Sequence, residues 1–181
     1  MKFITSIISA AAVTLFGLGY LQKKRRNIVL LGAVSRVLYV VQYLLAGAFA
    51  GAVLDVLGAA SAIVAGKKDT PFLKKYARWV IAALTLAMLA AGVALAIVQK
   101  KPLELLPMVG VALQAGALWL TKERDIRRLS LLGTPFWLIY NLWHLQSGSL
   151  AVIGDVWSLV SLGIAMARYD LPARKQGGEE Q

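Results

Sequence analysis

The sequence contains no cysteine and a single histidine, His144. The absence of cysteine excludes disulfides, a thiolate nucleophile and a cysteine metal site. The sequence also has no phosphate-binding glycine loop, no metal-ligand cluster and no nucleophile–base pair at a usual spacing. We therefore expect neither an enzyme nor a bound metal or cofactor.

Charged residues are scarce and unequal in sign. They make up 16% of the chain, with 20 basic residues against 9 acidic ones, whereas 59% of the residues are hydrophobic. A mean hydropathy of +0.67 is far too high for a soluble domain and is typical of a polytopic membrane protein. The basic excess could indicate nucleic acid, but the Lys and Arg residues form short clusters between apolar runs. We expect the lipid bilayer as a partner, and no nucleic acid.

Seven apolar runs divide the chain, and each is long enough to cross about 30 Å of hydrocarbon at about 1.5 Å per residue. The sequence thus predicts an all-α membrane protein with seven transmembrane helices. A signal peptide is the alternative for the first run, although no cleavage site precedes Lys23. Very short turns at Gly47 and Gly148 predict two helical hairpins, with glycine where a positive φ is needed. The runs are residues 3–21, 28–46, 48–65, 76–98, 103–120, 129–146 and 150–167.

Basic residues gather at alternate ends of these runs. Sixteen of the 20 Lys and Arg residues lie at the ends of the first, third, fifth and seventh runs, against Lys2, Lys100 and Lys101 on the other side. By the positive-inside rule, this asymmetry predicts an inner-membrane protein with its N-terminus outside and its C-terminus in the cytoplasm.

The chain contains an internal repeat, because residues 131–166 restate residues 30–65 in the same direction. Leu31-Gly32 matches Leu132-Gly133 at an offset of 101, and Asp55-Val56 matches Asp155-Val156 at an offset of 100. A unit with an odd number of spans, repeated directly, would be inverted in the membrane. The unpaired run 76–98 therefore acts as a linker helix that restores the orientation.

The predicted organisation is 3+1+3, with two parallel triple-helix units. The first unit covers residues 1–66, and the basic loop with the linker helix covers 67–101. The second unit covers 102–168, and residues 169–181 form a polar cytoplasmic tail that we expect to be disordered.

This plan resembles the SWEET and PQ-loop superfamily. The segment 102–110, Pro-Leu-Glu-Leu-Leu-Pro-Met-Val-Gly, and the two hairpins that begin with Leu-Leu-Gly resemble more closely the YgjV-type family of bacterial inner-membrane proteins. The superfamily implies a facilitator or proton-coupled transporter with a pocket between the two units. The chain departs from the superfamily pattern, because it has no Pro-Gln dipeptide and has span prolines, Pro107 and Pro135, only in the second half. We therefore expect hinges in the fifth and sixth helices only.

Asp55 and Asp155 are the sharpest chemical feature of the sequence. Each lies about six residues, or ~9 Å, from the outer turn of an apolar run. A carboxylate at that depth costs about 2.5 to 3.5 kcal/mol, so such residues usually face a bundle interior or a water-filled cavity. A pair at one depth predicts a central pocket, and acids there favour a cationic solute or a proton. The alternative is that each acid only holds helices together through hydrogen bonds.

Arg36 makes the two halves unequal. It lies at nearly the depth of Asp55, and its long side chain could reach that carboxylate. The matching position in the second unit is Trp137, so Asp155 has no such cation. We therefore expect Asp55 to be a paired structural charge and Asp155 to be the acid that exchanges a proton.

Further candidates lie near these acids. Asn141 is level with Asp155, and His144 lies one turn closer to the outside, as an interfacial residue or, less favoured, a proton relay. Tyr39 and Tyr140 match in the repeat, as packing residues or as a gate. Glu104, in the first turn of the fifth run, is expected only to favour the positive end of the helix dipole.

The function that these features favour is SWEET-like transport of a small polar solute, such as a sugar, an amino acid or an amine, or of a proton. The alternative is a structural or accessory membrane protein in which the buried acids hold helices together. A cavity with a polar lining that continues to one membrane face would favour transport, and direct burial of both acids would favour the alternative. The sequence is also compatible with a homo-oligomer.

Overall fold

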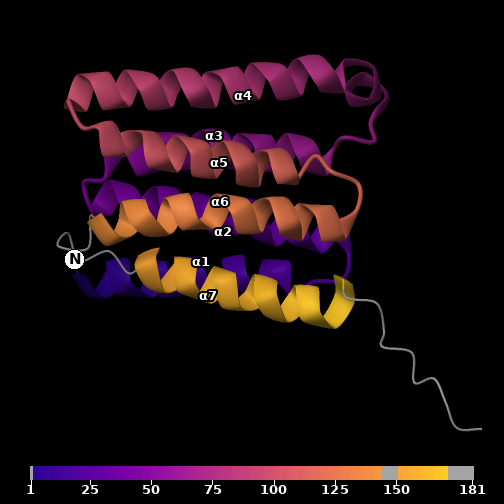
Figure 1. Cartoon of the computed structure of the whole chain (residues 1–181), viewed down its shortest axis with the longest axis horizontal. Helices are drawn as coiled ribbons and strands as arrows, with labels where there is room; N and C mark the ends of the chain where they lie inside the picture. The colour runs from indigo at the N-terminus through magenta and orange to yellow at the C-terminus, as the bar shows by residue number, and fades with distance from the viewer. Residues whose placement is uncertain (1, 144–150, 171–181) are drawn as a thin grey trace, which may run out of the picture.

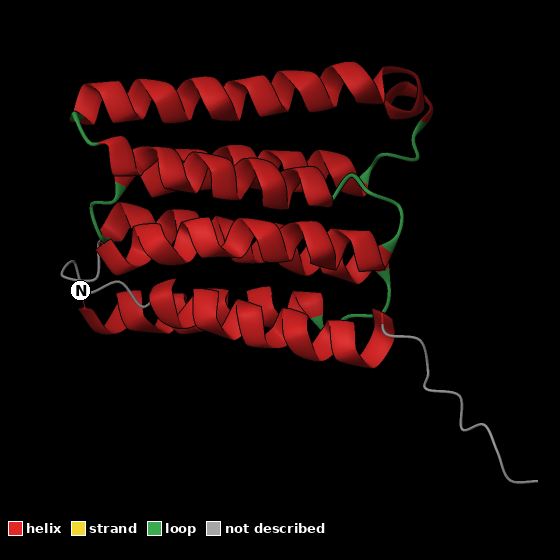
Figure 2. Ribbon diagram, viewed as in Figure 1, coloured by secondary structure: helices red, strands yellow, loops and turns green. Residues whose placement is uncertain are grey.

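The computed structural model describes residues 2–143 and 151–170, and within these the chain is all-helical, with seven α-helices and no strand (Figures 1 and 2). A 3-10 turn, η1 (Pro102–Glu104), precedes the fifth helix, and a π-helical turn, η3 (Met166–Asp170), follows the seventh. The helices are α1 (Lys2–Tyr20), α2 (Arg25–Leu45), α3 (Phe49–Gly66), α4 (Pro71–Gln99), α5 (Leu105–Ala117), α6 (Glu123–Trp143) and α7 (Ala151–Ala165).

The helices form two rows that face each other. In one row α2 packs between α1 and α3, and in the other α6 packs between α5 and α7. The rows meet at their edges, where α1 packs on α7 and α3 packs on α5 (Figure 1). At the centre α2 and α6 face each other through longer side chains, and this is where the candidate site lies. Helix α4 lies outside the rows, against α3 and α5.

The predicted apolar runs coincide with the seven helices, but they are not equally suited to a membrane. Four segments are long and apolar enough to span one: Arg25–Leu45, Phe49–Gly66, Pro71–Gln99 and Ala151–Asp170. The segments Ser6–Tyr20 and Pro102–Ala117 are apolar but shorter. Helix α6 is less apolar, because it begins six residues before the predicted run and takes in the charged stretch Glu123-Arg124-Asp125.

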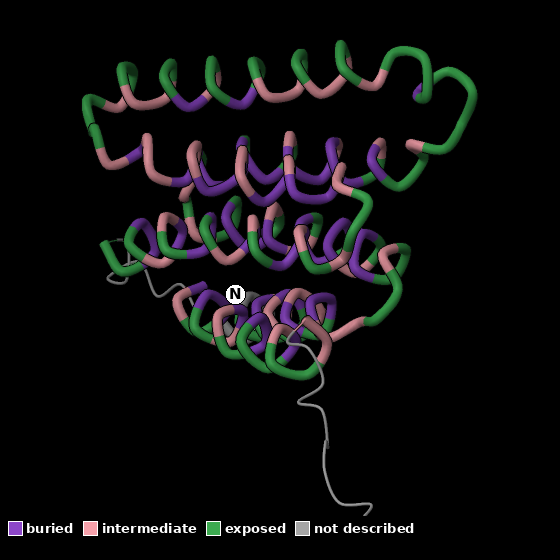
Figure 3. The backbone as a smooth tube through the Cα atoms, turned by 45° about the vertical axis from the view of Figure 1, so that its right-hand side comes forward, coloured by how far each residue is buried: buried purple, intermediate pink, exposed green. Residues whose placement is uncertain are grey.

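The outer surface of the bundle is apolar. On α2, large aliphatic side chains at a helical spacing are 39–51% exposed, namely Val34, Val37, Val41 and Leu44. Only Leu73, Met88 and Gly92 of the long helix α4 are buried, so most of that helix faces outward (Figure 3). An apolar surface of this extent would be a liability in water and suits contact with lipid.

The turns that carry most of the basic residues lie at one end of the bundle. The α1–α2, α3–α4 and α5–α6 turns lie at one end of the bundle, and the α2–α3 and α4–α5 turns lie at the other (Figure 1). Gly47, in the α2–α3 turn, has a φ of 71°, which confirms the predicted glycine turn. Gly148 and His144 lie outside the described residues.

The two prolines differ in position. Pro135 lies inside α6, where its missing N–H leaves a helix carbonyl without its usual donor. Pro107 is the third residue of α5, and α5 follows η1 directly. The structure describes η1 and α5 as one continuous stretch, Pro102–Ala117. The expected bends at Pro107 and Pro135 both stay predictions.

Candidate functional site

A buried ion pair joins α2 to α3. The guanidinium Nη1 of Arg36 lies 2.5 Å from Oδ1 of Asp55, and both residues are less than 5% exposed. Gly58, one turn along α3, leaves the space that the guanidinium fills, because a Cβ there would clash with it. The predicted contact between Arg36 and Asp55 is confirmed.

Gln114 extends this pair to the other row, and the sequence interpretation missed it. Arg36 Nη2 donates to Gln114 Oε1 at 3.0 Å, and Gln114 Nε2 donates to Thr134 Oγ1 at 3.2 Å. Thr134 in turn donates to the backbone carbonyl of Ser130. A polar chain thus runs from α3 through α2 and α5 to α6. A signal was available, because Gln114 and Glu104 are the only polar side chains in the run 103–120.

Asp155 on α7 has a neutral partner instead. Asn141 Nδ2 donates to Asp155 Oδ2 at 2.8 Å, and Asn141 Oδ1 accepts a hydrogen bond from the Tyr43 hydroxyl at 3.2 Å. Asp155 is 8% exposed, and no Lys, Arg or His within the described residues forms an ion pair with it. The two matching acids therefore have the unequal surroundings that the exchange of Arg36 for Trp137 predicts.

One small cavity between α2 and α6 reaches both acids. Its volume is about 20 Å³, which is room for about one water molecule and far less than a sugar or an amino acid needs. The cavity as described is therefore too small for a solute of that size. The lining consists of Asp55, Asp155, Arg36 and Gln114 together with the aromatic rings of Phe16, Tyr39, Tyr43 and Trp137.

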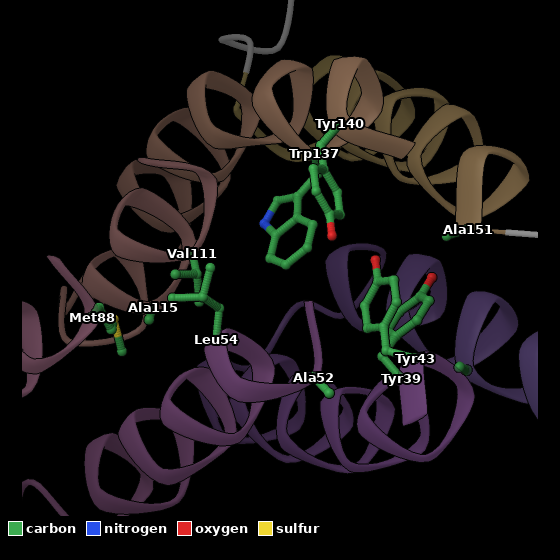
Figure 4. Close-up of a cluster of buried hydrophobic side chains, with 11 residues drawn as sticks. Tyr39, Tyr43, Ala52, Leu54, Met88, Val111, Ala115, Trp137, Tyr140 and Ala151 are labelled. Carbon is green, nitrogen blue, oxygen red and sulfur yellow. The ribbon is translucent and has the colours of Figure 1, made fainter. Parts of the chain in front are cut away.

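Aromatic rings from the two rows close the centre. Tyr39 and Tyr43 on α2 point toward Trp137 and Tyr140 on α6 (Figure 4). The rings of Tyr43 and Trp137 are stacked, with centroids 6.0 Å apart. The Phe16 ring lies 5.9 Å from the Arg36 guanidinium, a cation–π distance that adds to the neutralisation of this buried charge.

The matching tyrosines occupy different surroundings. Tyr39 lines the cavity, and its hydroxyl lies against Gly154, next to Asp155. Tyr140 lies outside the lining and its phenol interacts with the carboxyl group of Glu104. Glu104 stands at the start of α5, as expected, but it is also only 1% exposed, which the sequence did not predict. It is a third buried acid, at the α4–α5 end of the bundle.

A comparison with protein families places the chain. Residues 3–172 match the Imp-YgjV model, described as a bacterial inner membrane protein. The chain belongs to this family. The match takes in all seven helices and the candidate site, and it confirms the family-level resemblance and the inner membrane. No curated protein and no solved structure matches the chain.

Two arginines tie helices together at the end of this Imp-YgjV protein that is opposite Gly47. Arg25 at the start of α2 donates to the carbonyls of Leu120, Leu118 and Ala65 at 2.9, 2.5 and 3.0 Å. These carbonyls lie at the ends of α5 and α3, so one side chain ties three helices together. From the sequence, Arg25 is only one of the basic residues that indicate orientation in the membrane.

Arg127 near the start of α6 makes the corresponding contacts in the other half. It donates to the carbonyls of Tyr20 and Gln22 at 3.3 and 3.1 Å and pairs with Asp170 at 2.5 Å. These acceptors follow α1 and α7. Each arginine therefore ties the start of its own row's middle helix to an edge helix of both rows.

Proposed function

We propose that the chain crosses the inner membrane seven times, with the N-terminus outside and the C-terminus in the cytoplasm. The basic turns that follow α1, α3 and α5 lie together at one end of the bundle, which supports this topology. The apolar outer surface supports lipid contact along the helices. Helix α6 can cross because its charged first turn would lie at the cytoplasmic interface.

We further propose a SWEET-like 3+1+3 organisation, with units 1–66 and 102–168 joined by the loop and linker helix of residues 67–101. If α1, α2 and α3 match α5, α6 and α7, a twofold axis along the membrane normal would exchange the α1–α7 contact with the α3–α5 contact. Both contacts are present. The equivalent contacts of Arg25 and Arg127 support the same axis, and the position of α4 outside the rows suits a linker.

The proposed function is transport of a small polar solute through the centre of the bundle, by facilitation or coupled to protons. The observation that carries the proposal is that the two repeat-related acids, Asp55 and Asp155, border one cavity between the rows. Because Arg36 neutralises Asp55, the charge left for a ligand is that of Asp155. This favours a proton or a cationic solute over a neutral sugar.

Transport requires a second conformation, since the cavity holds only about one water molecule. The closed end formed by Arg25 and Arg127 and the aromatic closure around Tyr43 and Trp137 are the contacts that would have to open in turn. The described conformation is then the occluded one.

An uptake screen tests the proposal. The purified full-length chain is reconstituted into liposomes and offered labelled sugars, amino acids and amines, with and without a pH gradient, beside protein-free liposomes. We expect uptake of a cationic solute, or a proton flux, above the protein-free level. Absence of any flux across all three classes would contradict the proposal.

A second candidate is a structural or accessory membrane protein. It is favoured by the burial of both acids against hydrogen-bonding neighbours and by the small size of the cavity. In that case Asp155→Asn would change stability and leave membrane flux at the protein-free level. The same liposomes therefore separate the two functions.

A further inference from the structure

A groove runs between α2 and α3 on the outside of the bundle, at the end that carries the basic turns. Its volume is about 390 Å³, far more than that of the central cavity. The groove is hollow because small residues, Ala33, Ala62 and Gly66, form its floor, whereas the larger side chains of Leu30 and Ile63 border it. Leu30 is 57% exposed and Ile63 is 51% exposed, so the groove opens to the surroundings of the bundle.

Both walls of the groove belong to segments long and apolar enough to span a membrane, Arg25–Leu45 and Phe49–Gly66. Because the chain belongs to an inner membrane family, the medium against these exposed aliphatic side chains is lipid. An acyl chain can therefore lie against Leu30 and Ile63.

The end of the groove is basic. Arg25, Arg26 and Lys67 line it together with one acid, Asp69. Arg26 and Lys67 are exposed, and neither forms an ion pair or a side-chain hydrogen bond with the described part of the chain. Arg25 is occupied by helix carbonyls, but its positive charge still faces this corner.

Lys68 adds to the positive field. Its Nζ donates to the carbonyl of Leu120 at 3.3 Å. Burial and then the charge of Arg25 lower the pKa of Lys68, while Asp69 and Glu123 act in the opposite direction. Asp69 is one acid beside Arg25, Arg26, Lys67 and Lys68, so it offsets only part of the positive charge at this corner.

We propose that this groove binds one anionic phospholipid of the cytoplasmic leaflet, with an acyl chain along Leu30 and Ile63 and the phosphate at Arg26 and Lys67. A cluster of basic residues beside an apolar surface at the cytoplasmic interface is the chemistry that recognises anionic headgroups. The inference rests on family membership and on the two walls. It does not depend on the proposed transport.

The test is lipid binding to the purified full-length chain in detergent, followed by native mass spectrometry. Phosphatidylglycerol is compared with phosphatidylcholine of the same acyl chains. The test variant is the double substitution Arg26→Gln and Lys67→Gln. The matched control, Arg124→Gln with Arg128→Gln, removes two basic charges at the same end of the bundle but away from the groove.

We expect the wild type to prefer phosphatidylglycerol. Each cation near an anionic headgroup contributes about 5-fold to binding. The groove variant lacks two of them, so its preference for phosphatidylglycerol should be about 25-fold smaller than that of the wild type. The control pair should stay within about 2-fold of the wild type. An equal loss in the control pair would mean a general effect of positive charge and would overturn the proposal, as would a wild type that does not distinguish the two lipids.

Two further arms separate a lipid from a soluble phosphate. Gly66→Leu keeps every charge and fills the groove, and a Cβ at residue 66 meets only Val29 at an ordinary distance of 3.5 Å. We expect this variant to weaken binding of both lipids. Unchanged lipid binding in Gly66→Leu, or displacement of the lipid by glycerol phosphate at equal concentration, would identify a phosphate site without an acyl-chain groove and contradict the proposal.

Discussion

Arg36 holds Asp55 in a buried ion pair with 2.5 Å between Nη1 and Oδ1. The matching acid of the second half, Asp155, accepts a hydrogen bond from the neutral amide of Asn141. One substitution in the repeat, Arg36 against Trp137, thus gives two equivalent carboxyl groups different surroundings in the same cavity. We therefore expect Asp55 to stabilise the fold and Asp155 to bind the transported proton or cation.

Asp55→Asn should destabilise the fold by about 3 to 5 kcal/mol, because it leaves the Arg36 guanidinium buried without a counter-charge. The measurement is chemical or thermal unfolding of the purified protein in detergent. Asp69→Asn, which removes an exposed acid from the α3–α4 turn, is the control and should stay close to wild type. Equal stability of the two variants would show that the ion pair does not contribute to the stability of the fold.

Gln114→Leu should cost about 1 to 3 kcal/mol, because the second nitrogen of Arg36 and the hydroxyl of Thr134 both lose a buried partner. Gln114→Glu is the informative companion, since it keeps the acceptor for Arg36 but gives up the N–H that reaches Thr134. We expect its unfolding midpoint to lie between those of wild type and Gln114→Leu. A Gln114→Leu protein as stable as wild type would contradict this link between the rows.

These residues show how much of the fold and of the site can be predicted from the sequence. Apolar runs predict the helices because length and hydropathy are local properties, and the Arg36–Asp55 contact follows from depth in two adjacent helices. Gln114 and Glu104 were missed as buried groups because their surroundings depend on how the rows meet. Arg25 and Arg127 were missed as helix ties because their acceptors are backbone carbonyls, which leave no mark in the sequence.

Topology is testable with reporters. A fusion partner that is active only in the cytoplasm should work after Gln181 and fail before Met1, because the clustered basic turns belong on the cytoplasmic side. A periplasm-dependent reporter should give the reverse pattern. Activity of the same reporter at both termini would require an even number of crossings and would end the 3+1+3 proposal.

Arg127→Gln should loosen the end of the bundle opposite Gly47, since the ties to Tyr20, Gln22 and Asp170 depend on its guanidinium. Because the chain has no cysteine, a single one placed at Ser130 can report access to this end. We expect a thiol reagent to label it several-fold faster in the Arg127→Gln background. Arg128→Gln, at the exposed neighbouring position, is the control. Equal labelling in both backgrounds would mean that Arg127 does not keep this end closed.

The most direct test of the central claim is flux as a function of pH in liposomes that contain wild type or Asp155→Asn. The amide in this variant still offers an oxygen to Asn141, so the fold should persist, which unfolding in parallel verifies. We predict that wild-type flux depends on pH and that Asp155→Asn, equally well folded, has lost this dependence. The same pH dependence in both proteins would contradict the assignment of Asp155 as the acid that binds the transported proton or cation.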